Sequence, residues 1–150
     1  MIITAASPTD AKTLAELHRV CRQKAMPWLP ELHSPEEDLR YFETRVLPVE
    51  TVLIAWEGGH AAGFVSFHQG WLNHLYVAPD CWRLGFGTRL LEAVRSDLSY
   101  LQLWVFQKNA RARHFYTTHG FCEREATDGR YNEERVPDLR MEWARHDRDH

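Results

Sequence analysis

The segment Leu72–Leu98, LNHLYVAPDCWRLGFGTRLLEAVRSDL, has the pattern of a strand that leads into a helix through a turn with two glycines. Its apolar first part ends at Pro79, and Gly85 and Gly87 then stand one residue apart, just before leucines at helical spacing. The first N–H groups of a helix lack intrahelical partners and lie at the positive end of its dipole. Glycine lets a ligand approach this backbone closely, so the turn favours a phosphate or diphosphate site. From these residues alone, an ordinary strand-to-helix turn is an equal alternative.

Hydrophobic patterns on both sides of this segment predict a chain of the α/β class. Strands are expected at residues 1–6, 51–57, 60–68, 72–78, 101–106, 121–126 and 138–144, and helices at 7–25, 34–46, 88–98 and 109–120. Ser7, Ser34 and Asn109 stand at the expected N-caps, and Gly58-Gly59 is a two-residue hairpin signal. The resulting order, β-α-α-β-β-β-α-β-α-β-β, implies a mixed sheet covered by helices on both faces.

Composition and charge indicate one soluble globular domain over residues 1–150, with residues 145–150 expected to form a frayed tail. The chain has 150 residues, 44% of them hydrophobic, and a formal net charge of −3 without a basic stripe, which argues against a nucleic-acid partner. No window approaches the roughly 20 apolar residues of a membrane span, and the N-terminus lacks a signal-peptide pattern. The three cysteines have no short spacing, so reduced thiols and a cytoplasmic location are expected.

Two familiar phosphate motifs do not match the glycine turn. A dinucleotide fingerprint needs a third glycine or alanine where Leu90 stands, and a P-loop needs Gly-Lys followed by Ser or Thr. The segment LYVAPDCWRLGFGTRLL instead resembles the acetyl-coenzyme A signature of the GNAT superfamily of N-acetyltransferases, Arg/Gln-x-x-Gly-x-Gly/Ala after a Leu-x-Val strand. The later segment NARARHFYTTHGF resembles the family's second signature, Asn-x-x-Ala-x-x-x-Tyr followed closely by Gly-Phe. The expected order of elements also agrees with that fold, so the resemblance covers nearly the whole chain.

The resemblance implies that acetyl-coenzyme A is the cofactor and that backbone N–H groups hold it. The chain departs from the signature at Trp82, which stands where the family has Arg or Gln, and the basic residue is Arg83. Because the backbone does most of the binding, we expect the site to survive this change, with Arg83 turned towards a phosphate. The residues expected to contact the coenzyme are Leu75, Tyr76, Val77, Arg83, Leu84, Gly85, Phe86, Gly87, Thr88, Asn109 and Tyr116.

By resemblance, Tyr116 is the expected general acid for the departing thiolate. A phenol, with an ordinary pKa of about 10, is protonated at neutral pH and can give its proton to a thiolate of pKa about 8.5. Tyr116 shares a helical face with Ala112, four residues earlier, although a core aromatic beside Phe115 would have the same pattern. For the proton that the amine must lose, His74 is one candidate base and a water relay is the leading alternative. A half-buried packing role for His74 also fits the strand.

Two loops are expected to shape an acceptor pocket, because aromatic rings and carboxylates suit a cationic amine. They carry Trp28, His33, Glu36, Glu37, Tyr131, Glu133 and Glu134. Glu36 and Glu37 also fall in a first helical turn, where acidic residues are favoured for the helix alone. The Leu-His-x-x-Glu-Glu-like loop and the Asn-Glu-Glu…Pro-Asp stretch resemble an uncharacterised bacterial subgroup of the family. His114 and His119 are five residues apart and no cysteine pair accompanies them, so no metal site is expected.

The implied function is an N-acetyltransferase that moves an acetyl group from acetyl-coenzyme A to a primary amine of a small molecule or peptide. Direct attack in a ternary complex is expected, because no cysteine occupies a motif position that would indicate an acetyl-enzyme. The alternative is a non-catalytic acyl-coenzyme A-binding module, which the lack of an obvious base favours. Neither nucleic acid nor a membrane is expected as a partner, and a homodimer would fit the sheet edges.

Overall fold

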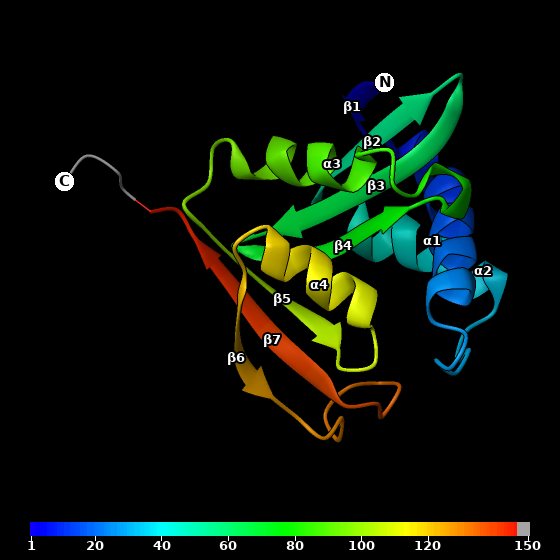
Figure 1. Cartoon of the computed structure of the whole chain (residues 1–150). Coiled ribbons are helices and arrows are strands. Elements are labelled where there is room, and N and C mark those ends of the chain that lie inside the picture. The colour runs from blue at the N-terminus through cyan, green and yellow to red at the C-terminus, as the bar shows by residue number, and fades with distance from the viewer. Residues whose placement is uncertain (147–150) are drawn as a thin grey trace. The chain divides into compact units, whose positions relative to one another are not determined.

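The computed structural model describes residues 1–146, and contacts between residues divide the chain into two compact units, Met1–Val94 and Arg95–His150 (Figure 1). Strands and helices follow one another in the predicted order. The predicted frayed tail starts too early, because the Arg145 N–H donates to the Ser99 carbonyl at 2.8 Å. The rest of that tail, residues 147–150, lies outside the described residues. The single domain expected over residues 1–150 stays a prediction.

The first unit contains four antiparallel strands in the order β1-β2-β3-β4. Their bounds are Ile2–Ala5 for β1, Thr51–Glu57 for β2, His60–His68 for β3 and Trp71–Val77 for β4. Gly58 and Gly59 close the β2–β3 hairpin with φ values of 57° and 81°. Positive φ at both central residues is what a type I′ turn requires, which is why this pair marks the hairpin in the sequence.

Three helices complete the first unit: α1 (Ala11–Ala25), α2 (Pro35–Tyr41) and α3 (Phe86–Arg95). The predicted capping box of α2 is present, since the Glu37 N–H donates to Ser34 Oγ at 3.1 Å and the Ser34 N–H donates to the Glu37 carboxylate at 2.8 Å. After Tyr41 the helix continues as a π-helical turn, Phe42–Val46. Helix α3 ends three residues before its predicted end, because the Leu98 N–H turns back to the Arg95 carbonyl.

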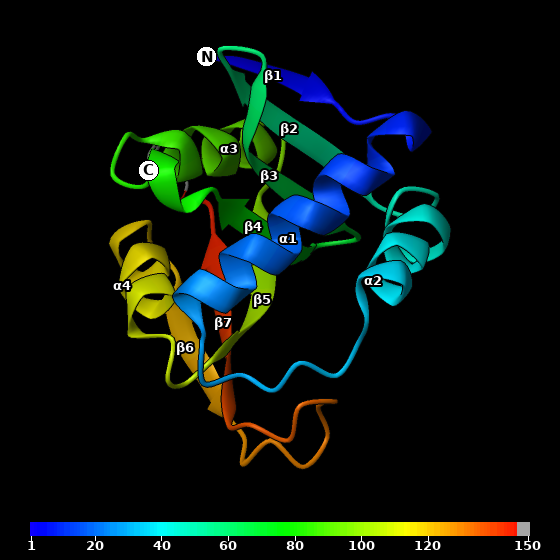
Figure 2. The ribbon, with the colours of Figure 1, turned by 90° about the vertical axis from the view of Figure 1, so that its right-hand side faces the viewer.

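Helices cover both faces of the first unit's sheet, as Figure 2 shows for α1 and α3. On one face, Leu14 of α1 and Phe42 after α2 pack with Ile54 of β2 and Phe64 of β3, and all four are fully buried. Successive strand residues face opposite sides, so Gly63 lies on the other face. A Cβ at Gly63 would lie 3.2 Å from Leu90 Cδ1 of α3, which places α3 on that second face.

Gly63→Ala is expected to lower the free energy of unfolding by about 1–3 kcal/mol, because overpacking forces a shift of backbone or core. The added Cβ would stand 2.7 Å from the Tyr76 carbonyl oxygen of the neighbouring strand. Urea denaturation measures the change, and Ala61→Ser, at a half-buried position two residues earlier in β3, is the control, expected to change stability by less than about 0.5 kcal/mol. An unchanged midpoint for Gly63→Ala would contradict the close approach of β3 and β4.

The second unit holds three antiparallel strands in the order β5-β7-β6 and one helix. The bounds are Tyr100–Phe106 for β5, Cys122–Ala126 for β6, Asp138–Ala144 for β7 and Ala110–Thr118 for α4. Asn109 caps α4 as predicted, since its Oδ1 accepts the Ala112 N–H at 3.2 Å. Gly120, with a φ of 91°, ends this helical segment. Leu101, Leu103 and Met141 form the buried side of these strands.

Candidate functional site

The glycine turn after β4 is exposed and sharply curved. β4 runs into a 3₁₀ turn, Pro79–Cys81, and Arg83 and Gly85 then have φ values of 69° and 88°. Glycine adopts this left-handed region at little steric cost, whereas arginine rarely does. The turn therefore holds the Arg83 backbone in an unfavourable conformation. Leu84 is 68% exposed, whereas Phe86 is buried and anchors the start of α3.

The turn ends at the N-terminus of α3, as predicted. The first hydrogen bond along the helix joins the Arg89 N–H to the Gly85 carbonyl at 3.1 Å. The amides before Arg89 therefore lie at the positive end of the helix dipole. Apart from Gly85 itself and its two neighbours in the chain, no atom of the described residues lies within 4 Å of the place where a Gly85 Cβ would stand, so a ligand can approach this backbone closely.

The backbone N–H and C=O groups of Leu75 and Val77 point away from β3, towards the other edge of β4. The Ala78 N–H donates to the Ala62 carbonyl at 2.8 Å, and β4 pairs Tyr76 with Phe64 in the same antiparallel register. Hydrogen-bonding groups alternate sides along a strand, so Tyr76 and Ala78 use the β3 side and the residues between them use the other. Leu75 and Val77 are among the residues that the family resemblance implies contact the coenzyme, and that contact stays a prediction.

The Val77 carbonyl, at the end of this edge, accepts two hydrogen bonds from side chains. Trp82 Nε1 donates to it at 2.8 Å, and Cys21 Sγ of α1 donates at 3.3 Å. Burial raises the pKa of the Cys21 thiol to about 12, so the sulfur keeps its proton. In the sequence, Trp82 stands out only as a departure from the signature and Cys21 only as one of three reduced thiols, so their meeting at this carbonyl was not predicted.

Tyr116 and Asn109 lie in the second unit, on and before α4. The Tyr116 ring is 8% exposed and meets Phe115 and Phe121 edge to face, with ring centroids 5.4 and 5.3 Å away. The ring therefore packs as a core aromatic does, and the acid role of its phenol stays a prediction. Asn109 performs its capping role, and its contact with the coenzyme also stays a prediction.

His74 is buried on the α1 side of the first unit's sheet with both ring nitrogens close to hydroxyl groups. Its Nδ1 lies 2.6 Å from Ser66 Oγ, and its Nε2 lies 3.3 Å from the Tyr41 phenol. Burial lowers the pKa of His74 to about 4, because the charged imidazolium would lose its hydration. His74 is therefore neutral at physiological pH and sits among Phe42, Phe64 and other rings. The predicted packing role and the predicted role as base both involve this neutral form.

His18, which was not predicted as a site residue, lies against His74 with ring centroids 5.3 Å apart. Its ring is also 4.8 Å from that of Tyr76, and its Nδ1 is buried without a hydrogen-bond partner among the described residues. Burial, followed by the nearby His74 and Arg22, keeps the pKa of His18 well below its ordinary value. A signal was present, because His18 falls on the apolar stripe between Leu14 and Cys21, where a histidine is unusual.

The loop between α1 and α2 carries the predicted pocket residues Trp28 and His33, and the first turn of α2 carries Glu36 and Glu37. Arg19 of α1 holds the loop in shape. The Arg19 guanidinium contacts Asp38 at 2.6 Å, Glu31 at 2.9 Å and the His33 carbonyl at 3.2 Å. Glu37 already uses its carboxylate in the α2 cap, and that backbone hydrogen bond from Ser34 lowers the pKa of the carboxyl. Trp28 is half-buried, whereas His33, Glu36 and Glu37 are exposed.

The loop between β6 and β7 carries the other predicted pocket residues and is closed by Asn132. The Asn132 side chain donates to the Val136 carbonyl at 2.7 Å and accepts the Val136 N–H at 3.2 Å. Tyr131 is 89% exposed, and the Arg130 guanidinium lies 6.0 Å from its ring centroid. Glu133 is exposed and Glu134 half-buried.

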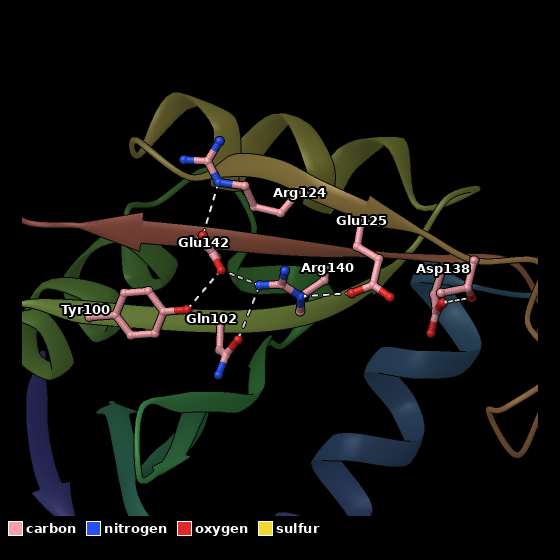
Figure 3. Close-up of polar contacts among 8 residues, drawn as sticks. Tyr100, Gln102, Arg124, Glu125, Asp138, Arg140 and Glu142 are labelled. Carbon is pink, nitrogen blue, oxygen red and sulfur yellow. Dashed lines mark hydrogen bonds and ion pairs between the residues drawn. The ribbon is translucent and has the colours of Figure 1, made fainter.

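A polar network crosses one side of the β5-β7-β6 strands (Figure 3). The Glu142 carboxylate accepts from Arg140, from Tyr100 at 3.0 Å and from Arg124 at 3.0 Å, while Arg140 also donates to Glu125 at 3.1 Å. The hydrogen bond from Arg140 lowers the pKa of Glu142. Because each of these carboxylates already has a cationic partner, the network stabilises strand pairing and is a poor candidate for binding an amine.

Residues 1–146 contain no group of three or more side chains suited to hold a metal ion. Within that same range, no helix is both long and apolar enough to cross a membrane.

Comparisons with known proteins identify relatives of this chain. A model of the acetyltransferase (GNAT) family matches residues 13–121. The peptidyl-lysine N-acetyltransferase YiaC of Escherichia coli (strain K12) is 41% identical over 66 residues, which cover 43% of this chain and 45% of YiaC. The chain spans about half the length of the curated relatives it matches.

Solved structures share the fold over nearly the whole chain. Apo YjaB from Escherichia coli superposes with a TM-score of 0.77 at 19% identity and covers 95% of this chain and 98% of its own. The PaiA N-acetyltransferase from Thermoplasma acidophilum, solved in complex with coenzyme A, gives a TM-score of 0.72 at 20% identity, covering 97% of this chain and all of its own. The predicted fold class is therefore confirmed.

Proposed function

Because the chain belongs to the GNAT acetyltransferase family, we propose that it moves an acetyl group from acetyl-coenzyme A to a primary amine of a small molecule or peptide. One observation carries the proposal: residues 75–88 combine an outward strand edge, a left-handed turn at Arg83 and Gly85, and a helix N-terminus. These features supply backbone donors for a diphosphate and a pantetheine arm within one short segment. The region matched by the family model contains all of this segment.

In this proposal the turn at residues 83–88 binds the diphosphate, and the outward edge of Leu75–Val77 binds the pantetheine arm. The coenzyme A in the PaiA structure supports the choice of ligand, because that protein shares the fold. Arg83, exposed in the turn, adds positive charge next to the phosphates. No metal has a part in the proposed binding.

The proposed reaction is a direct transfer. The deprotonated amine attacks the thioester carbonyl carbon, a C–N bond forms, and the C–S bond breaks. An N–H group of the β4 edge stabilises the charge that develops on the carbonyl oxygen, and Tyr116 gives its phenolic proton to the leaving sulfur. The proton that the ammonium group loses before the attack passes to water, and the proton that the nitrogen loses as the amide forms returns through water to the Tyr116 phenolate. We assign the first of these protons to water and not to His74, because both ring nitrogens of His74 lie against hydroxyl groups and its pKa is about 4.

A lysine side chain is the amine that we propose to test first, because YiaC, which matches over 66 residues, is named a peptidyl-lysine N-acetyltransferase. The two loops supply aromatic faces and carboxylates that attract an ammonium group. Glu37 is the weakest of these candidates, since its carboxylate already caps α2. The proposed contacts are Trp28, His33, Glu36, Glu37, Tyr131, Glu133 and Glu134.

The experiment that tests the function follows release of free thiol from acetyl-coenzyme A with a panel of amines. Lysine-containing peptides, polyamines, aminoglycosides, free amino acids and peptide N-termini are each offered at the same concentration. Turnover with at least one class is expected. Tight binding of the coenzyme without turnover of any amine would instead favour the non-catalytic acyl-coenzyme A-binding module.

Saturating coenzyme A is expected to raise the melting temperature by roughly 5–10 °C. A ligand that binds only the folded state stabilises that state by about 2.7 kcal/mol when its concentration is about 100 times its Kd. Each kcal/mol of added stability raises the melting temperature of a domain of this size by about 2–4 °C. Differential scanning fluorimetry measures the shift, and pantothenate, which lacks the diphosphate, serves as the control with a small shift or none. An unchanged melting temperature at saturating coenzyme A would contradict both the acetyltransferase and the non-catalytic coenzyme-binding function.

A further inference from the structure

Ser66, His74 and Tyr41 form a hydrogen-bonded chain that leads from inside the first unit's sheet to its surface. Ser66 and His74 stand opposite each other on β3 and β4, and Ser66 is fully buried. Ser66 Oγ lies 2.6 Å from His74 Nδ1, and His74 Nε2 lies 3.3 Å from the Tyr41 phenol oxygen. Tyr41, the last residue of α2, is 41% exposed, so the chain reaches solvent at this end.

The direction of these hydrogen bonds follows from the burial of Ser66. Within residues 1–146, the Ser66 hydroxyl has no side-chain hydrogen bond other than the one with His74. A buried O–H left without an acceptor is costly, so we assign the Ser66 proton to this bond, with His74 Nδ1 as the acceptor. Burial lowers the pKa of His74 to about 4, so its ring is neutral and carries its one proton on Nε2. The Nε2–H therefore donates to the Tyr41 phenol oxygen.

This chain orients the Tyr41 phenol and does not conduct a proton. A relay needs a further partner at each end, whereas the chain stops at Ser66 inside the sheet. Since the phenol oxygen accepts from His74, the phenol's own O–H points away from that ring as a donor. The hydroxyl, the imidazole and the phenol are all neutral, and Glu36 and Glu37 in the first turn of the same helix disfavour an anion. The donor therefore suits a neutral acceptor group, such as an amide carbonyl.

The phenol lies beside the part of β4 to which the proposed function assigns the thioester. The imidazole that contacts Tyr41 belongs to the residue directly before Leu75, whose N–H points to the outward edge of the strand. The attacking nitrogen must keep its lone pair for the thioester carbonyl carbon, so an O–H donor does not serve the reacting amine itself. It is placed to serve a second group of the same acceptor molecule.

We propose that Tyr41 is a specificity-determining residue for the acceptor, whose phenolic O–H binds an amide carbonyl of the molecule that carries the reacting amine. Ser66 and His74 are positioning residues, because they act through Tyr41. This inference rests on the proposed function and deepens it, since it selects an amine that is joined to an amide, as in a lysine residue of a peptide, over a simple alkylamine.

The test compares two amines that share a reacting group. Nα-acetyl-lysine methylamide carries its primary amine on a molecule with amide carbonyls, whereas pentylamine has the alkylamine alone. Release of free thiol from acetyl-coenzyme A gives kcat/KM with each amine, and calorimetry gives the Kd of coenzyme A. Tyr41→Phe removes only the phenolic O–H. Tyr100→Phe is the matched control, because Tyr100 is 39% exposed and its phenol donates to Glu142.

The wild type is expected to prefer the lysine amide to pentylamine. Tyr41→Phe should lower kcat/KM about tenfold with the lysine amide, as for a polar group left without its partner, and by less than about twofold with pentylamine. The Kd of coenzyme A should stay at the wild-type value, because the coenzyme does not contact Tyr41 in this proposal. Tyr100→Phe should match the wild type with both amines.

The proton of His74 provides a measurement that does not depend on turnover. Long-range ¹H–¹⁵N correlations of the imidazole near neutral pH, assigned by their absence in His74→Gln, should place this proton on Nε2 in the wild type. Ser66→Ala removes the O–H donor, so it should weaken the preference for Nε2 and lower kcat/KM for the lysine amide in the same direction as Tyr41→Phe. A proton on Nδ1 in the wild type would overturn the assignment on which the inference depends.

The remaining outcomes separate this inference from the proposed function. An unchanged kcat/KM in Tyr41→Phe, or an equal loss with both amines, would overturn the inference alone. The same holds if the wild type acetylates neither of the two amines but does acetylate another amine of the panel. A wild type that acetylates no amine at all would overturn the proposed function as well.

Discussion

Replacing Tyr116 with phenylalanine is expected to lower kcat about 100-fold near neutral pH while leaving the affinity for acetyl-coenzyme A nearly unchanged. A positioned general acid contributes roughly 100- to 10,000-fold to a rate, and Tyr116→Phe removes only the phenolic O–H. The ring that packs between Phe115 and Phe121 is retained, so the fold of α4 should persist. Steady-state kinetics with the best amine of the panel measures kcat, and calorimetry measures the affinity.

Tyr100→Phe is the matched control for this variant. The Tyr100 phenol donates to Glu142 at 3.0 Å in the polar network of the second unit, where no part of the reaction is proposed (Figure 3). Its kcat is expected to equal that of the wild type. If Tyr116→Phe also turns over at the wild-type rate, Tyr116 is only the core aromatic that its packing describes, and the proton for the thiolate comes from elsewhere.

The folded protein is expected to lose about 3 kcal/mol of stability through His74 alone as the pH falls from 6.5 to 4. The folded pKa of His74 is about 4, whereas an unfolded histidine titrates near 6.5. Between these values the unfolded chain binds a proton that the folded chain does not, so unfolding becomes easier as the pH falls. Above pH 6.5 neither state is protonated and this contribution is fully present. Below pH 4 both states are protonated and the loss stays constant. His18, whose pKa is also lowered, adds a loss of the same sign.

Urea denaturation at several pH values measures this effect as a difference between variants, because carboxyl groups also titrate in the range. His74→Gln should reduce the slope of stability against pH between 6.5 and 4, whatever its stability at pH 7. His60→Gln, at an exposed histidine on the β2–β3 hairpin, should keep the wild-type slope. If the free energy of unfolding depends on pH in the same way for the wild type and for His74→Gln, the His74 imidazole is not held neutral in the folded protein.

The features that the sequence predicted correctly depend on neighbours in the chain. The capping box of Ser34 and Glu37, the cap at Asn109 and the Gly58-Gly59 hairpin each need only a few consecutive residues, and all three are present. The glycine turn between strand and helix belongs to the same group, because glycine readily takes the positive φ that Gly85 has. These elements, together with the hydrophobic periodicity, were enough to predict the order of strands and helices.

The features that the sequence did not predict are contacts between distant residues. His18 and His74 are 56 positions apart, and only the crossing of α1 over β4 brings their rings together. Likewise, Cys21 and Trp82 meet at the Val77 carbonyl from opposite directions along the chain. Arg145 was assigned to a frayed tail because nothing in the polar C-terminal sequence indicates that its N–H reaches Ser99. Such pairings depend on the packing of whole elements, which no short motif encodes.

The most direct measurement of the central claim is a titration of ¹⁵N-labelled protein with coenzyme A, followed by amide chemical shifts. Coenzyme A should shift the amides of residues 83–88 and the outward amides of Leu75 and Val77 more than those of the β2–β3 hairpin at Gly58 and Gly59. Binding that leaves the amides of residues 83–88 unmoved, or no binding at millimolar coenzyme A, would contradict the assignment of this turn as the diphosphate site.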